Sequence, residues 1–267
     1  MSAVLPTPAG SGERDPAQDE AHFRYVLRLG DTSLVLAQRL SEWIGHAPAL
    51  EEDLGLANLA LDLLGQARLL LTYAGELEGR GRDEDALAFL RDAPDFVNLA
   101  LAEQPNGDFG QTIVRQWLID TWQLEMYTAL SASADTRLAA IAAKALRETR
   151  YHHRFSSGWL MRLGDGTPES QRRAQRALDD LWRFTAELFA PDETDERMSR
   201  AGIAPQLPEL AARWSARVDE DLRAATLRRP PDQPYPWHGK RGEHTEHLGH
   251  MLPEMQHLQR TYPGVRW

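Results

Sequence analysis

The sequence predicts an all-α protein built as a bundle of long helices. From Phe23 onward apolar residues recur at intervals of three and four, and short alternating runs bounded by turn residues are almost absent. Four of the periodic segments are each about 25 residues long and are joined by both short and long connections, which is typical of a helical bundle. The 267 residues, 42% of them hydrophobic and 26% charged, are enough for a substantial core.

The first half of the chain is expected to hold an N-terminal extension followed by the first helices. Residues 1–20 mix proline, glycine and charge without a basic start or an apolar core, so they predict a disordered extension and not a signal peptide. Prolines near helix starts and the EGRGRDED turn set the boundaries that follow. We expect helices over about 21–45, 48–77 and 85–91, and a further helix that opens at Pro94 and ends before QPNGDFG.

The second half predicts longer helices that end at glycine- and proline-rich segments. The LGDGTP segment, Pro191, the RRPPDQPYPW segment and Tyr262-Pro263-Gly264 are the expected stops. No internal linker or repeat is visible, so residues 21–267 are expected to form one domain. We expect helices over about 111–131, 136–162, 168–190 and 207–227, and a last helix from just after Gly242 to Tyr262.

Composition excludes several kinds of function. The chain has no cysteine, which removes disulfides, thiolate metal sites and cysteine nucleophiles and fits a reducing cytoplasm. A net charge of -10 argues against a nonspecific grip on nucleic acid or on anionic membranes. The most apolar stretch, 54–71, is interrupted by polar residues and falls short of the roughly 18 apolar residues of a membrane span. A cytoplasmic protein without nucleic acid or membrane partners is therefore expected.

Four of the predicted helices each carry a stripe of polar or ionisable residues. Members of a stripe are three or four residues apart, so they lie on the same side of a helix. Buried ionisable groups are costly unless they are paired or bound to metal, so a shared polar interior needs a reason. The stripes are Gln38 and Glu42; Asn58, Asp62 and Gln66; Gln116, Asp120 and Gln123; and Lys144, Glu148 and His152.

These stripes depart from the ligand pattern of carboxylate-bridged di-iron bundles. Such bundles take a Glu from each of two helices and an ExxH pair from each of the other two. Here the residue three after Asp62 is Gly65, and the residue three after Glu148 is Tyr151. His152 stands four after Glu148, so the pattern favours a metal-free polar core. The alternative is a self-sufficient di-iron or di-manganese oxygenase with an atypical ligand set of Glu42, Asp62, Asp120, Glu148 and His152.

Lys144 is a further member of the stripes with two interpretations. It and Lys240 are the only lysines among the 30 basic residues. On an inner stripe its ammonium would neutralise Glu148 and face Asp62, as a cation built into the protein. On an outer face it would form an ordinary i, i+4 pair with Glu148 of little energetic weight.

The C-terminal segment is rich in histidine. His244, His247 and His250 recur every three residues, and Glu254 with His257 forms a literal ExxH. No second ExxH faces it, so hydrogen-bonded or surface histidines are favoured over interface contacts, and both over a metal site. The apolar positions at helical spacing are expected to pack within the bundle or against a partner, with the histidines flanking them. These positions are Leu248, Met251, Leu252, Met255 and Leu258.

Several long strings resemble a known family. The chain resembles the PaaC subunit family of the ring-1,2-phenylacetyl-CoA epoxidase, a multicomponent monooxygenase of aerobic phenylacetate degradation, over about Tyr25–Trp267. The strings that carry the resemblance are YVLRLGDTSLVLAQRLSEWIGHAP, LANLALDLLGQAR, LAEQPNGDF, RYHHRFSSGWLMRLGDGT, LWRFTAELF and HTEHLGHMLPEMQHLQRTYPG.

The resemblance implies a ferritin-like bundle that serves as the noncatalytic sister of a catalytic subunit. That partner would hold the di-iron centre and most of the phenylacetyl-CoA, other components would include a reductase that supplies electrons from NADPH, and this chain would carry no cofactor. The resemblance also implies an acyl-CoA-facing role for two segments, against the simpler interpretation as a helix start and a solvated helix end. The first is Asp95, Phe96, Val97 and Asn98, and the second is Glu196, Arg197 and Met198. A helical adaptor unrelated to oxygen chemistry is the third hypothesis.

Overall fold

Four long helices form the body of the protein, and aspartates begin three of them. In this computed structural model, which describes residues 15–234 and 238–265, Asp15, Asp108 and Asp135 accept hydrogen bonds from backbone N–H groups in the first turns of α1, α4 and α5. Such caps satisfy N–H groups that have no partner within the helix. The four helices are α1 (Pro16–Glu42), α2 (Leu50–Glu78), α4 (Phe109–Leu130) and α5 (Thr136–Gly164).

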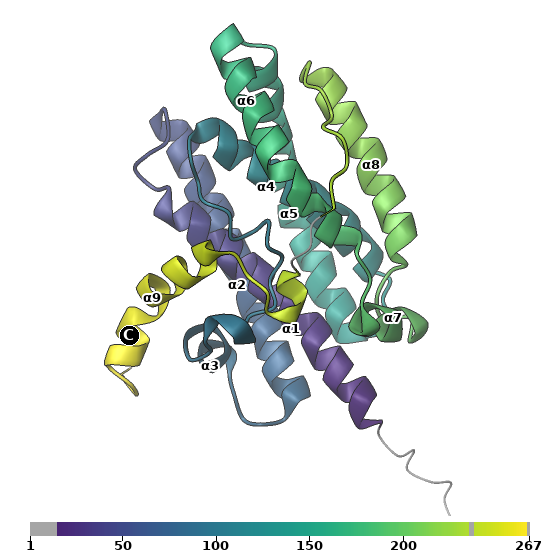
Figure 1. Ribbon diagram of the computed structural model, residues 1–267. Coiled ribbons are helices and arrows are strands. Elements are labelled where there is room, and N and C mark those ends of the chain that lie inside the picture. The colour runs from purple at the N-terminus through teal and green to yellow at the C-terminus, as the bar shows by residue number, and fades with distance from the viewer. Residues whose placement is uncertain (1–14, 235–237, 266–267) are drawn as a thin grey trace, which may run out of the picture.

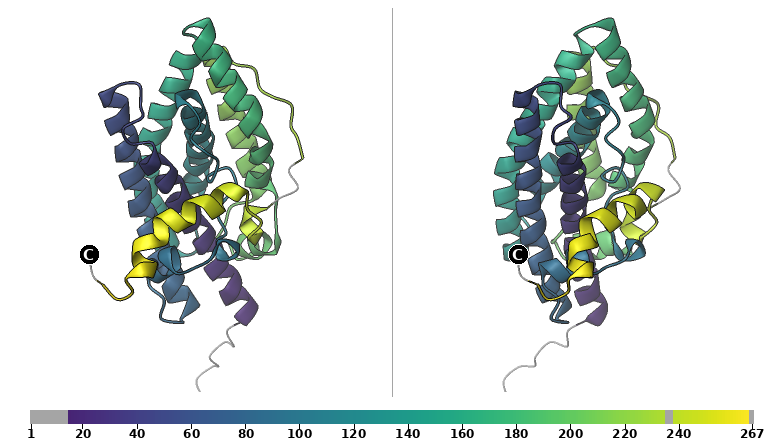
Figure 2. Two further views of the ribbon diagram at one scale, coloured as in Figure 1. Left: turned by 60° about the vertical axis from the view of Figure 1, so that its left-hand side comes forward. Right: turned by 90° about the vertical axis from the view of Figure 1, so that its left-hand side faces the viewer.

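The remaining helices surround this body. The helix α1 packs along α2, α4 packs along α5, and α6 and α8 cover the α4–α5 side. Figure 1 shows this arrangement, and Figure 2 shows α9 crossing one face of the bundle obliquely. The other elements are α3 (Glu84–Phe89), η1 (Ala93–Asp95), α6 (Pro168–Leu181), η2 (Trp182–Phe189), α7 (Glu193–Arg200), α8 (Leu207–Ala224), η3 (Gly239–Arg241) and α9 (Glu246–Thr261).

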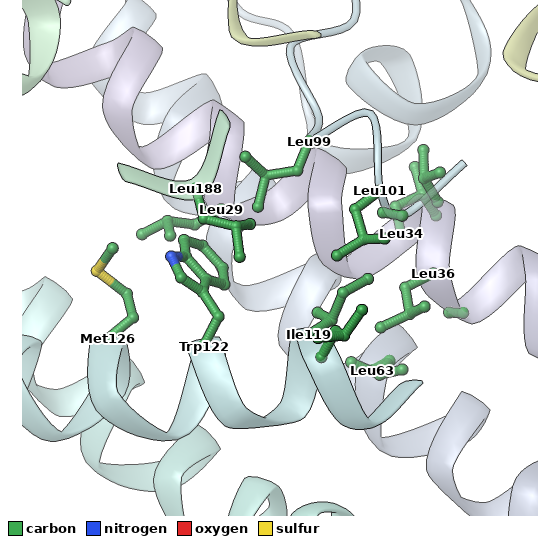
Figure 3. Packing of buried hydrophobic residues seen from close by; sticks show 14 of the residues in the cluster. Leu29, Leu34, Leu36, Leu63, Leu99, Leu101, Ile119, Trp122, Met126 and Leu188 are labelled. Carbon is green, nitrogen blue, oxygen red and sulfur yellow. The ribbon is translucent and has the colours of Figure 1, made fainter. Parts of the chain in front are cut away.

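The predicted all-α, ferritin-like bundle is confirmed. The buried apolar side chains form one cluster that runs through all four long helices. Figure 3 shows its centre, where Leu29 and Leu36 of α1 face Ile119 and Trp122 of α4. The helices α1 and α4 are buried along most of their length, so they form the middle of the bundle.

The prediction of a helix from Pro94 to the QPNGDFG segment is wrong. A 3-10 turn covers Ala93–Asp95, and residues 96–108 are irregular. Carboxylates from distant elements accept hydrogen bonds from backbone N–H groups that a helix would have paired internally. The Val97 N–H donates to Asp31, and the Ala100 N–H donates to Glu187. These buried acceptors satisfy the backbone without a helix, and the segment passes between α1 and η2.

Two helix boundaries and one short helix also differ from the prediction. The helix α1 begins at Pro16, so residues 16–20 are helical and not part of a disordered extension; residues 1–14 lie outside the described residues. The helix α6 ends at Leu181 and continues as the 3-10 helix η2 to Phe189. The short helix α7, which was not predicted, begins with a capping box between Asp192 and Asp195.

Two glycines of α5 give a matched test of how tightly α5 packs against α8. A Cβ at Gly164 would lie 1.9 Å from the carbonyl oxygen of Ala225, whereas a Cβ at Gly158 would meet nothing within 4 Å. We therefore expect Gly164→Ala to destabilise the protein by about 1 to 3 kcal/mol. Gly158→Ala should stabilise it by up to about 1 kcal/mol, because alanine favours the helix. Urea unfolding followed by circular dichroism measures both, and equal effects would contradict the close contact.

Candidate functional site

The predicted polar stripes of α2, α4 and α5 meet inside the bundle. The Nε2 of His152 lies 3.1 Å from a carboxylate oxygen of Asp62, and the amide of Gln66 donates to Glu148 at 3.0 Å. Asp120 accepts from the side chains of Gln116 and Ser156, each at 2.7 Å. We call Asp62, Gln66, Asp120, Glu148 and His152 the interior polar group, and its assembly follows the spacing predicted from the sequence.

The interior polar group runs from the core to the surface between α2 and α5. Asp120 and His152 are completely buried, whereas the Asp62 side chain is 40% exposed. Burial raises the pKa of Asp120, although the nearby His152 and the hydrogen bond from Ser156 act in the opposite direction. The group therefore contains a buried carboxylate at Asp120 and a partly solvated one at Asp62, and the His152 imidazole contacts the second of these.

Two residues of the predicted set lie outside this group. Lys144 is exposed, and among the described residues no ion pair joins it to Glu148 or to Asp62, so the internal-cation interpretation is wrong. Glu42 lies in the last turn of α1 and pairs with Arg39 at 2.8 Å. Glu42 is instead close enough to Arg115 of α4 to act on its pKa, so it lies beside buried cations and not in the interior polar group.

The contribution of α1 to the polar interior comes from a residue that the sequence analysis missed. The Ser33 hydroxyl is completely buried and lies 3.4 Å from the hydroxyl of Tyr127, and the amide of Gln123 donates to it at 3.4 Å. The available signal was a small polar residue in the middle of an apolar face, which is weak because serine also occurs in ordinary helix packing.

The donor set does not fit a two-iron centre. The carboxylates are occupied by protein donors, namely the amides of Gln66 and Gln116, the hydroxyl of Ser156 and the ring of His152. Within residues 15–234 and 238–265 there is no cluster of three or more His, Asp or Glu side chains arranged to hold a metal ion. The buried polar atoms left without a protein partner include the amide oxygen of Gln66 and the Nδ1 of His152. We therefore derive no catalytic step from the interior polar group.

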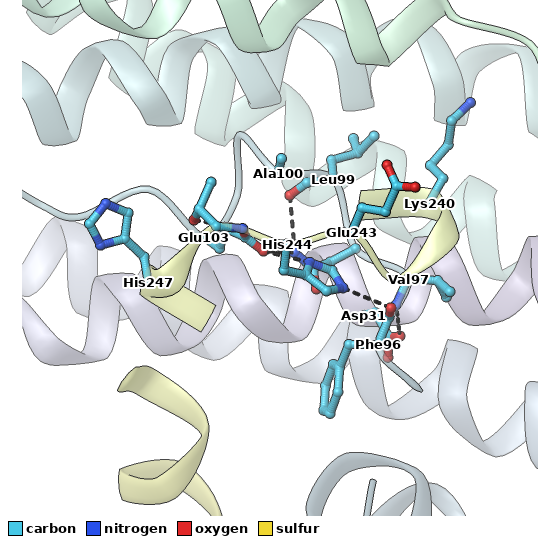
Figure 4. A network of polar contacts seen from close by, with 12 residues as sticks. Asp31, Phe96, Val97, Leu99, Ala100, Glu103, Lys240, Glu243, His244 and His247 are labelled. Atoms are coloured by element: carbon cyan, nitrogen blue, oxygen red, sulfur yellow. Dashed lines mark hydrogen bonds and ion pairs between the residues drawn. The ribbon is translucent and has the colours of Figure 1, made fainter. Parts of the chain in front are cut away.

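A second polar network attaches the C-terminal segment to the bundle (Figure 4). The buried carboxylate of Glu103 accepts from the amide of Asn98 at 2.9 Å, the Nδ1 of His244 at 2.8 Å, and both the N–H and the hydroxyl of Thr245 at 2.6 and 2.8 Å. The Nε2 of His244 lies 2.8 Å from the carbonyl oxygen of Phe96. We call these residues the C-terminal clasp.

Buried charges extend from the clasp toward α7. Glu187 accepts backbone hydrogen bonds from Ala100 and Lys240, and burial raises the pKa of Glu187 to about 7. The Lys240 ammonium is buried and pairs with Asp195 of α7 at 2.7 Å, and Arg28 pairs with Asp192, the N-cap of that helix. The rarity of lysine thus pointed to a buried cation, but that cation is Lys240 and not Lys144.

The two segments with an implied acyl-CoA role border different but neighbouring surface pockets, both lined by Glu20 and Arg24 of α1. Phe96, Val97 and Asn98 are buried in and beside the C-terminal clasp, and the exposed Asp95 lines a surface pocket of 340 Å³. In the other segment Met198 is buried, Glu196 is exposed, and Arg197 pairs with Glu193 beside a different pocket of 470 Å³. Their role in binding acyl-CoA stays a prediction.

The C-terminal helix packs largely as expected. Leu248, Met251 and Leu252 are buried against the bundle and Met255 is half-buried, whereas Leu258 is 49% exposed. The histidines flank this face: His247 is half-buried, and His250 and His257 are exposed. His244, just before α9, is the histidine with the strongest structural role.

The clasp predicts a pH dependence of stability. Burial alone would lower the pKa of His244, but the hydrogen bond and negative charge of Glu103 outweigh it, so the pKa is raised. Both ring nitrogens face acceptors, which only the imidazolium can satisfy. The folded state is therefore stabilised fully below the unfolded pKa of about 6.5, and this contribution is lost as pH rises through the raised pKa of His244.

Melting temperatures measured from pH 5.5 to 9 check this expectation in the wild type and in His244→Gln. Glu187 adds a slope of the same sign, since its raised pKa removes stability between about pH 4.5 and 7. Above pH 7 the wild type should therefore lose stability more steeply than His244→Gln. Parallel curves would show that His244 does not titrate as the clasp requires.

Together these features define a class: a ferritin-like helical bundle with an apolar core that encloses a small polar group, whose carboxylates are satisfied by the chain's own side chains. The chain belongs to the phenylacetic acid catabolic protein family, whose model matches residues 10–267. It is similar to one of the subunits of the 1,2-phenylacetyl-CoA epoxidase of Escherichia coli (strain K12), with 58% identity over 243 residues that cover 91% of this chain and 98% of that protein. The resemblance seen in the sequence is thereby confirmed.

Proposed function

We propose that this chain is a noncatalytic structural subunit of a phenylacetyl-CoA 1,2-epoxidase in phenylacetate catabolism. The similarity to a protein named as a subunit of that enzyme supports the assignment to the complex. The observation that supports the noncatalytic role is the interior polar group, in which glutamine, serine and histidine side chains occupy the carboxylates that a di-iron bundle would use for metal.

The proposal assigns the chemistry to other components of a cytoplasmic hetero-oligomer. A catalytic sister subunit of the same fold would hold the di-iron centre and most of the phenylacetyl-CoA. A reductase component would supply electrons from NADPH. This chain would carry no cofactor and would stabilise the catalytic subunit by binding to its folded state.

The alternative, a self-sufficient di-iron oxygenase with an atypical ligand set, fits the geometry less well. It requires Glu42 near Asp62, but Glu42 pairs with Arg39 in the last turn of α1. It also leaves one imidazole, that of His152, for two metal ions, where such bundles use two.

Reconstitution tests the proposal. The chain is coexpressed with the products of its neighbouring genes, and phenylacetyl-CoA oxidation with NADPH is measured with and without it. We expect the two bundle subunits to copurify, and the catalytic partner alone to be less soluble or less active than the pair. Separate elution at micromolar concentration, with a fully active partner alone, would contradict the structural role.

A further inference from the structure

The helix α2 presents a row of exposed leucines. Leu50, Leu54, Leu61 and Leu64 are between 40% and 69% exposed, and their spacing of four, seven and three residues places them on one face. Single exposed leucines are normal, but a row on one helix marks a surface that another molecule covers. Among the described helices, α2 is the one with the length and apolar character of a membrane span, and half of its most apolar window is buried within the bundle.

A row of exposed cations lies on the neighbouring helix α5. Lys144, Arg147, Arg150 and Arg154 are exposed, and no ion pair involves any of them in the described part of the chain. Other arginines of the chain, such as Arg82, Arg172 and Arg197, pair with carboxylates on their own helix or beside it.

The two rows adjoin where Leu61 and Leu64 of α2 lie level with Arg150 and Arg154 of α5, because Asp62 contacts His152 and Gln66 contacts Glu148. The helices α2 and α5 are linked along their length by Glu76 with Arg137, by Gln66 with Glu148, and by Asp62 with His152. Figure 2 shows α2 at the outer edge of the bundle beside α5. We call the exposed residues Leu50, Leu54, Leu61, Leu64, Lys144, Arg147, Arg150 and Arg154 the α2–α5 face.

We propose that the α2–α5 face is the surface that binds the catalytic sister subunit, through an apolar ridge on that subunit bordered by carboxylates. The inference rests on the proposed function. The uncompensated cations require an acidic counterpart, because complementary charge sets orientation and association rate at an interface. The net charge of -10 disfavours the other surface that an apolar and basic face would suit, an anionic membrane.

The face supplies about half of a standard protein interface. The exposed leucines span about four turns, or about 21 Å, and with the neighbouring helix they form a patch of about 20 by 20 Å. A standard interface takes roughly 800 Å² from each partner, so the neighbouring surface would have to contribute the rest.

Matched variants test the α2–α5 face in the coexpressed complex. Leu61→Glu is compared with Leu258→Glu, which changes an exposed leucine on α9. Arg147→Glu combined with Arg154→Glu is compared with Arg172→Glu combined with Arg176→Glu, which makes the same change of charge on α6. Affinity for the sister subunit is measured by titration at two salt concentrations, and melting curves of each isolated variant verify folding.

We expect both α2–α5 variants to weaken binding at least tenfold and both controls to change it less than threefold. The arginine variant should also reduce the salt dependence of affinity. If the wild type binds the sister subunit and the α2–α5 variants bind equally well, the α2–α5 face is not the binding surface, while the proposed function stands. If the wild type does not bind it, the proposed function fails as well. Binding of wild type to anionic vesicles, lost in the same variants, would overturn the choice of partner.

Discussion

Asp31→Ala is expected to destabilise the protein by about 3 to 5 kcal/mol, because it leaves a buried guanidinium without its counter-charge. Asp31 is completely buried, and Arg91 donates to both of its carboxylate oxygens, at 2.9 Å in one of the two contacts. The same carboxylate also accepts the Val97 N–H at 3.0 Å. The substitution therefore removes one of the residues, with Thr32 and Arg39, that join α1 to the irregular segment at 96–108.

Urea unfolding followed by circular dichroism measures the loss. Glu76→Ala is the control, because its pair with Arg137 is solvent-exposed and its removal should leave the unfolding midpoint close to that of the wild type. Replacing Asp31 and Arg91 together by leucine and methionine should recover part of the stability, since no unpaired charge is then buried. An Asp31→Ala midpoint equal to that of the wild type would refute this description of the core.

Glu103→Ala is expected to detach the C-terminal segment, at a cost on the order of 3 to 5 kcal/mol. The substitution leaves the donors of Asn98, His244 and Thr245 without their acceptor inside the protein. Each unpaired buried donor costs about 1 to 3 kcal/mol, and partial exposure of the segment to water limits the total.

Hydrogen exchange measures this effect locally. Amides of α9 should exchange much faster in Glu103→Ala, whereas amides in the middle of α4 should keep most of their protection. His250→Ala is the control, since that side chain is exposed at the same helix. Unchanged protection of α9 would show that its apolar contacts, through Leu248 and Met251, hold it without the clasp.

Local signals in the sequence were sufficient for the helices but not for the segment between α3 and α4. The periodicity of apolar residues and the proline and glycine stops act within a few residues, so the four long helices could be predicted, with only the start of α1 placed too late. The irregular path of 96–108 depends on acceptors at Asp31 and Glu187, which are far away in sequence. A helix signal after Pro94 is therefore overridden by tertiary contacts that no local pattern reports.

The same distinction applies to the candidate site. Spacing of four residues predicts that Asp62 and Gln66 share a face and that Glu148 and His152 do so, and the structure pairs them across α2 and α5. Spacing does not determine where a stripe leaves the core. Lys144 is therefore exposed although it is one turn from Glu148.

Iron content and turnover of the assembled epoxidase with Glu148→Gln in this chain test the central claim most directly. The substitution keeps the size and a hydrogen-bonding amide beside Gln66 but removes a carboxylate that any metal site in this bundle would need. We predict that iron per complex and NADPH-dependent oxidation of phenylacetyl-CoA both stay within about twofold of the wild type, since the catalytic centre lies in the partner. Stoichiometric loss of two iron ions together with loss of turnover would contradict a structural role for this subunit.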